Sequence, residues 1–122
     1  MHRFKELKVW QEAMELAKVV YATTKLFPAE EKFGLTSQIN RAAVSIPSNI
    51  AEGSGRSTDK DFAQFLNIAL GSAFELETQV LLANSFGFIP AENATTLLEK
   101  TDKIQRMLNS FRMTIIKSPK SN

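Results

Sequence analysis

The apolar residues between positions 35 and 50 recur at the spacing of one face of an α-helix. When each residue turns the helix by about 100°, six of them fall within an arc of about 100°: Leu35, Ile39, Ala42, Ala43, Ile46 and Ile50. This pattern predicts a helix over residues 29–51. Pro47 lies inside it and has no backbone N–H to donate to the carbonyl of Ala43. Gly53 or Gly55 is expected to end the helix, because glycine readily adopts the backbone conformations of helix ends.

The polar side of the same helix carries Ser48, Asn49 and Glu52. In one interpretation these side chains hydrogen-bond the backbone around Pro47 and the loop that follows, because buried polar side chains usually find backbone partners. In the other, they contact a ligand or an RNA. We favour the first interpretation, in which Pro47, Asn49, Glu52 and Gly53 form a structural turn.

Helical patterns also cover three other parts of the chain, residues 5–26, 58–86 and 90–117. The connections between the four segments are short, so consecutive helices are expected to run antiparallel. A chain of 122 residues is long enough to bury a core without disulfides or metals. The sequence therefore predicts a single all-α domain over residues 1–122, an antiparallel up-down-up-down four-helix bundle with a frayed tail at residues 118–122.

Residues with strong preferences for helix ends mark the last two of these segments. Thr58 is placed to cap the helix that follows it, with Asp61 three residues later. Gly87 is expected to end that helix in the left-handed conformation. Pro90 suits the first position of the last helix, where its missing N–H has no partner to lose.

The composition argues against catalysis. The chain has no cysteine and one histidine, His2, at its start. Thiol chemistry is thereby excluded, and a di-iron bundle would need two inward-facing Glu-x-x-His pairs. No phosphate-binding loop or dinucleotide-binding motif occurs. We therefore expect no enzyme activity, no metal, no cofactor and no small-molecule substrate. In the absence of a secretory segment or an apolar run of about 18 residues, we also expect a cytoplasmic protein without membrane contact.

Two of the predicted helices, residues 5–26 and 58–86, are apolar over more of their surface than the arc of about 100° that one side of a bundle needs. The surplus either thickens a core around the nine phenylalanines or lies at the surface and mediates self-association. A third alternative is a groove that recognises the helix of another protein. Gly71 disfavours the helix by about 1 kcal/mol relative to alanine, which suggests that another backbone passes close by.

Three long segments of the sequence resemble those of a known protein family. They are KVWQEA at residues 8–13, FGLTSQINRAAVSIPSNIAEG at residues 33–53 and DFAQFLNIALGSAFELETQ at residues 61–79. In order and spacing they resemble the four-helix-bundle proteins encoded by intervening sequences within bacterial 23S rRNA genes. The resemblance implies a bundle that assembles as a ring-like homopentamer and has no known enzyme activity. A related branch, the accessory proteins of diversity-generating retroelements, binds nucleic acid and a reverse transcriptase through a basic surface.

Positive charge is concentrated at the end of the chain. Residues 100–122 carry six basic side chains against Asp102 alone, whereas residues 1–99 carry nine basic and twelve acidic side chains. Lys103, Arg106 and Lys117 share the polar side of the last predicted helix, where clustered cations are typical of phosphate binding. The alternative is a solvated face whose charge complements the helix dipole. No aromatic residue interleaves with these cations, so base stacking is not indicated there.

The combined patterns predict a non-catalytic, homo-oligomeric bundle that binds RNA or DNA electrostatically through Lys103, Arg106 and Lys117. A protein-interaction scaffold without nucleic-acid affinity is the alternative.

Overall fold

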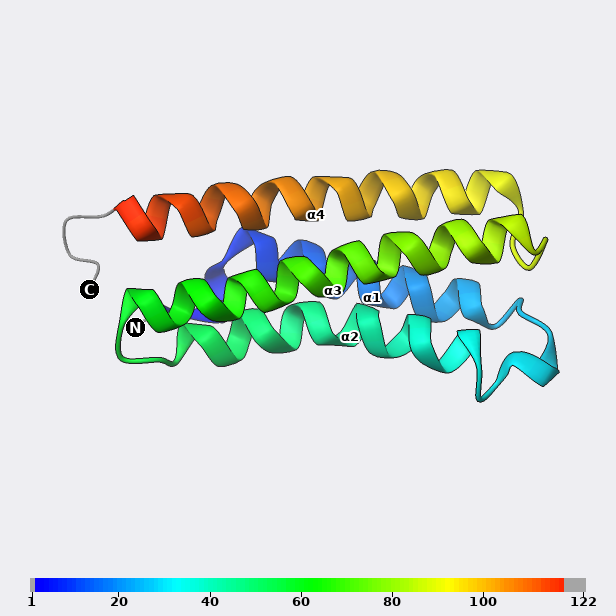
Figure 1. Ribbon diagram of the computed structural model, residues 1–122, viewed down its shortest axis with the longest axis horizontal. Helices are drawn as coiled ribbons and strands as arrows, with labels where there is room; N and C mark the ends of the chain where they lie inside the picture. The colour runs from blue at the N-terminus through cyan, green and yellow to red at the C-terminus, as the bar shows by residue number, and fades with distance from the viewer. Residues whose placement is uncertain (1, 118–122) are drawn as a thin grey trace.

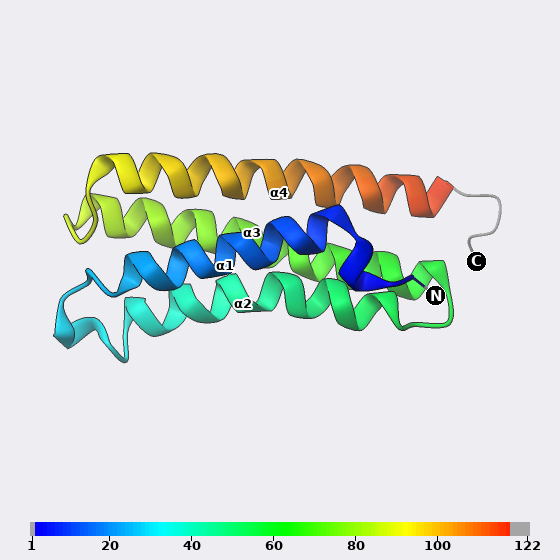
Figure 2. The same cartoon turned by 180° about the vertical axis from the view of Figure 1, so that it is seen from behind.

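The computed structural model describes residues 2–117, and these form four long helices and two short 3-10 turns (Figures 1 and 2). The long helices are α1 (Lys8–Thr24), α2 (Leu35–Ser54), α3 (Asp59–Ser85) and α4 (Ala91–Lys117), and the 3-10 turns are η1 (Phe4–Glu6) and η2 (Ala29–Glu31). No strand occurs between residues 2 and 117. The predicted all-α class is confirmed, while the predicted frayed tail lies outside the described residues.

The four helices pack as an antiparallel bundle. Each helix contacts the one that follows it, and α1 also contacts α4, so that the helices surround a common core. Every helix contributes fully buried apolar side chains to this core, including Leu16, Ile46, Leu66 and Leu108. The predicted four-helix bundle is confirmed.

The ends of α3 follow the sequence signals. The hydroxyl of Thr58 accepts a hydrogen bond from the backbone N–H of Asp61 at 3.1 Å, which caps the first turn. After α3, Gly87 has a φ of +75°, the left-handed conformation expected there. Pro90 directly precedes α4 instead of occupying its first position, and its carbonyl accepts hydrogen bonds from the N–H groups of Asn93 and Ala94.

The first half of the chain differs from the prediction at its helix boundaries. The second helix was expected from residue 29, but only η2 forms there and α2 begins at Leu35. Gly34 separates the two with a φ of −106° and a ψ of −116°, which is not a helical conformation. At the start of the chain, extended backbone at Leu7 separates η1 from α1 and delays the first helix to Lys8.

Gly53 does not end the second helix, which continues through Pro47 as far as Ser54. Gly55 follows as the residue after the helix, with a φ of −89°. Gly53 is buried where α3 crosses closely: a Cβ added to it would lie 2.5 Å from Cβ of Phe65 and 2.9 Å from Cδ1 of Phe62. Glycine is therefore required at this position because it has no side chain, and not because it stops a helix.

The substitution Gly53→Ala is expected to lower the free energy of unfolding by about 1–3 kcal/mol, because the new methyl group overlaps the two phenylalanines. Urea denaturation followed by circular dichroism measures this loss. Gly55→Ala is the matched control, since the nearest atom to its added Cβ is 3.7 Å away and its φ is negative. If Gly53→Ala were as stable as wild type, the close approach of α2 and α3 would be wrong.

Candidate nucleic-acid interface and association surfaces

Two of the three predicted phosphate-binding residues form ion pairs on the surface of α4. The ammonium group of Lys103 lies 3.3 Å from a carboxylate oxygen of Glu12 on α1, and Nε of Arg106 lies 2.9 Å from a carboxylate oxygen of Asp102. Lys117 is exposed at the end of α4. The side chains of Lys103 and Arg106 are 60% and 80% exposed, so each pair contributes about 0–1 kcal/mol. The acidic partners reduce the local charge, but they hold the cations only weakly.

The structure adds Lys8 to this cationic surface. Because α1 and α4 are antiparallel neighbours, the start of α1 lies beside the second half of α4 (Figure 2). An open hollow of about 460 Å³ lies between them at the surface. Its lining consists of Leu7, Lys8, Val9, Arg106, Met107, Ser110 and Phe111. Lys8 was missed from the sequence because it is almost a hundred residues from Arg106, and only the register of the first helix against the fourth brings them together.

Phe111 lies close to the cations in the structure. In the sequence analysis, no aromatic residue interleaved with these cations, so base stacking was not indicated there. Phe111 is half-buried and lines the same hollow as Arg106. Its ring makes edge contacts with Phe62, at 5.5 Å between centroids, and with His2, at 5.9 Å. The α1–α4 hollow thus combines two cations with an aromatic side chain.

The turn residues predicted around Pro47 make short-range contacts. The side-chain amide of Asn49 donates to the backbone carbonyl of Ser45 at 2.8 Å and to its hydroxyl at 3.0 Å. The same hydroxyl lies 2.8 Å from that of Ser72 on α3. Glu52 accepts a hydrogen bond from Arg56 in the loop after α2, at 2.9 Å. These contacts agree with a structural role for Asn49 and leave Glu52 at the surface.

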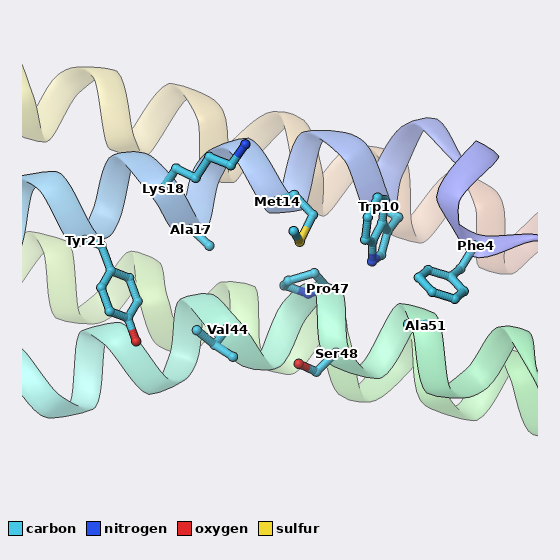
Figure 3. Close-up of a pocket in the computed structure, with 10 residues that line it drawn as sticks. All are labelled: Phe4, Trp10, Met14, Ala17, Lys18, Tyr21, Val44, Pro47, Ser48 and Ala51. Carbon is cyan, nitrogen blue, oxygen red and sulfur yellow. The ribbon is translucent and has the colours of Figure 1, made fainter.

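An apolar groove runs between α1 and α2 and has a volume of about 540 Å³. Figure 3 shows Trp10 and Met14 of α1 extending toward Pro47 of α2, with Tyr21 reaching toward Val44 further along. Ser48 is exposed and contributes a hydroxyl group to the lining of the groove. The groove is open and its lining is largely hydrocarbon, which makes it a surface suited to another apolar element.

The outer side of α3 is also apolar. Phe74 and Leu81 are seven residues apart and therefore share one side of the helix, and both are about half exposed. Ile68 and Leu82 are exposed as well. Gly71 lies among these residues, and apart from its two chain neighbours and the adjoining backbone of α3, no part of residues 2–117 comes within 4 Å of a Cβ added there. The sequence led us to expect a backbone close to Gly71, and within the described chain none approaches it.

Among residues 2–117, no cluster of three His, Cys, Asp or Glu side chains is suitable for a metal. A polar hollow of about 410 Å³ between α2 and α3 is lined by Gln38, Arg41, Ala42, Ser45 and Glu75. Its serine has a serine and an asparagine as hydrogen-bond partners and no base that would activate it.

Comparison with known proteins agrees with this fold. The family model of the 23S rRNA-intervening sequence proteins matches residues 5–110. The chain belongs to this family. No curated protein matches it.

A solved structure similar to this member of the 23S rRNA-intervening sequence family comes from Bacteroides thetaiotaomicron VPI-5482. It is described as a protein with unknown function from the S23 ribosomal protein family. The two share 29% sequence identity with a TM-score of 0.80, over 86% of this chain and 95% of the other. The fold of this chain is therefore shared with that protein at 29% sequence identity. Among residues 2–117, no helix has the length and apolar character that crossing a membrane requires.

Asn49 provides a test of the structural interpretation, although residues 47–53 lie within α2 and do not form the predicted turn. Asn49→Ala removes both hydrogen bonds to Ser45, so the free energy of unfolding is expected to fall by about 1–3 kcal/mol in urea denaturation. Glu52→Ala is the control, because the Glu52–Arg56 ion pair is exposed and its loss is expected to cost less than about 1 kcal/mol. Normal stability of Asn49→Ala together with lost nucleic-acid binding would favour the ligand-contact interpretation instead.

Proposed function

We propose that this member of the 23S rRNA-intervening sequence family is a non-catalytic, cytoplasmic, homo-oligomeric bundle that binds RNA or DNA electrostatically. The observation that carries the proposal is the position of Lys8 beside Arg106, which extends the basic side of α4 onto α1. Lys103 and Lys117 lie on the same helix as Arg106 and are exposed. Nucleic-acid binding through a basic surface is also what the resemblance to the retroelement accessory proteins implies.

Phosphate contacts account for most of the affinity in this proposal. Lysine and arginine pair with phosphates without reading sequence, so binding is weakly specific and falls steeply as salt rises. A phosphate replaces the carboxylates of Glu12 and Asp102 at little cost, since exposed ion pairs are weak. Each bundle offers only about four such cations, which favours an assembly that repeats them.

Self-association of the bundle would repeat these cations in every copy. The open α1–α2 groove and the apolar outer side of α3 are different surfaces, so contact between them in successive copies is heterologous and can close a ring. Gly71 supports α3 as one of these surfaces. Glycine destabilises a helix by about 1 kcal/mol relative to alanine, and no close contact within residues 2–117 requires it at this position. In the proposed assembly, the missing side chain lets a neighbouring copy approach α3 closely. A homopentamer is the ring that the family resemblance implies.

The same groove supports the alternative function. A partner protein's amphipathic helix placed between α1 and α2 would cover Trp10, Met14 and Tyr21 as effectively as a second copy. The two proposed functions predict different masses for the purified protein, because a scaffold that binds another protein is monomeric in its absence.

The first test of the proposed function replaces Lys8, Lys103, Arg106 and Lys117 with glutamine. Wild type is expected to bind a mixed-sequence RNA and a duplex DNA at low salt and to lose affinity as salt increases, while the fourfold variant binds both at least tenfold more weakly. Fluorescence anisotropy across a salt series measures this. The control variant Lys25→Gln and Lys32→Gln removes exposed lysines from the connection between α1 and α2, and is expected to bind like wild type. If the fourfold variant bound as tightly as wild type, the basic side of α4 would be a solvated surface without a role in nucleic-acid binding.

The second test concerns self-association through α3. In sedimentation at micromolar concentration, wild type is expected to be much heavier than the 13.6 kDa chain. Gly71→Leu is expected to shift the protein toward the monomer, because the side chain fills the space that a neighbouring copy needs. Thr95→Leu, on an exposed position of α4, is the control and should keep the wild-type mass. A monomeric wild type would remove the proposed assembly and favour the scaffold.

A further inference from the structure

We propose that the α1–α4 hollow takes up one unpaired base of a single-stranded RNA or DNA while Lys8 and Arg106 pair with the phosphates on either side. The inference rests on the proposed function and adds the form of the nucleic acid. Base contacts are absent from a purely electrostatic surface, so the hollow would distinguish single strands from duplexes.

The floor of the hollow suits the flat, largely apolar face of a base. The apolar residues of its lining are Leu7, Val9, Met107 and Phe111, which are less exposed than Lys8, Arg106 and Ser110. Phe111 provides an aromatic ring for base contact, and its edge contacts with Phe62 and His2 hold that ring in place. Met107 is unbranched and polarisable, which lets it adjust to bases of different size. Stacking on such side chains is tolerant of sequence because every base has a π face.

The rim of the hollow is polar and positively charged. Lys8 is exposed and has no ion-pair partner among residues 2–117. Nε of Arg106 lies 2.9 Å from a carboxylate oxygen of Asp102, and because the Arg106 side chain is 80% exposed, its guanidinium is open to a phosphate. Ser110 adds a hydroxyl that is able to bond a base edge. This combination of an apolar floor with cations at the rim fits a nucleotide better than it fits either a hydrocarbon or a bare anion.

The size of the hollow agrees with this occupant. Its volume of about 460 Å³ lies within the range of about 300–1,000 Å³ typical of small-ligand pockets. A base within a duplex is stacked and paired, so it enters such a hollow only after unstacking, which costs free energy. A single strand presents its bases without that cost. Single strands are therefore expected to bind more tightly than duplexes of equal charge.

The experiment compares three fluorescent ligands by anisotropy at low salt: a mixed-sequence single strand, the same strand with its bases removed at alternate positions, and a duplex. The full-length wild-type protein is expected to bind the intact strand about tenfold more tightly than either other ligand. Ser110→Met, which fills the hollow from an exposed helical position, and Phe111→Leu, which removes the ring, are expected to abolish this preference and leave duplex affinity unchanged. Ser110→Ala is the matched control and keeps the preference.

The outcomes separate this inference from the proposed function. Equal binding of the intact and partly abasic strands by wild type would overturn the base-binding hollow while keeping the electrostatic function. A preference that survives in Ser110→Met would overturn it too, and because Ser110 is exposed this variant does not depend on core packing. The double variant Lys8→Gln and Arg106→Gln is expected to bind all three ligands more weakly than wild type. Absence of binding to every ligand would overturn the proposed function and the inference together.

Discussion

The close approach of α2 and α3 at Gly53 is the contact on which the candidate interface depends. Without a side chain at this position, Phe62 and Phe65 of α3 pack directly against the backbone of α2. Phe62 is buried and in turn meets the rings of Phe111 on α4 and His2 before α1. The N–H of His2 also donates to the carbonyl of Ser54 at 3.1 Å, which ties the start of the chain to the end of α2. The position of Phe111 in the hollow is therefore linked, through Phe62, to the packing of α2 against α3 at the same end of the bundle.

The antiparallel arrangement decides which charges meet. Residues near the start of α1 face the middle and second half of α4, so Glu12 pairs with Lys103 and Lys8 shares the hollow with Arg106. A basic segment in the sequence thus becomes a mixed surface, in which two acidic residues partly neutralise the cations of α4. Such a surface favours weak, exchangeable phosphate contacts over tight attachment of a single copy.

The parts of this structure that were predictable from the sequence are those set by local spacing. The apolar stripe from Leu35 to Ile50, the Thr58 cap and the left-handed Gly87 each depend on residues within a few positions, and each appears as expected. The sequence left open whether Gly53 or Gly55 ends the second helix, because glycine serves both at helix ends and at close helix contacts; Gly55 follows its last residue, and the phenylalanines that meet Gly53 lie on another helix. The α1–α4 hollow was missed for the same kind of reason, since the register between distant helices is set by packing and leaves no local pattern.

The apolar residues left at the surface are the main structural argument for the proposed self-association. A core that already buries side chains from all four helices does not need Phe74, Leu81 or the groove beside Trp10, and leaving these in water opposes solubility. Covering them with copies of the same chain removes that cost and repeats the cations of α1 and α4 around the assembly. In the proposed assembly, a long strand bound by one copy would meet the next copy at high effective concentration, so that weak contacts would add up to useful affinity. Association and nucleic-acid binding are on this argument one property, and a variant that dissociates the assembly weakens binding to long strands even when its own cations are intact.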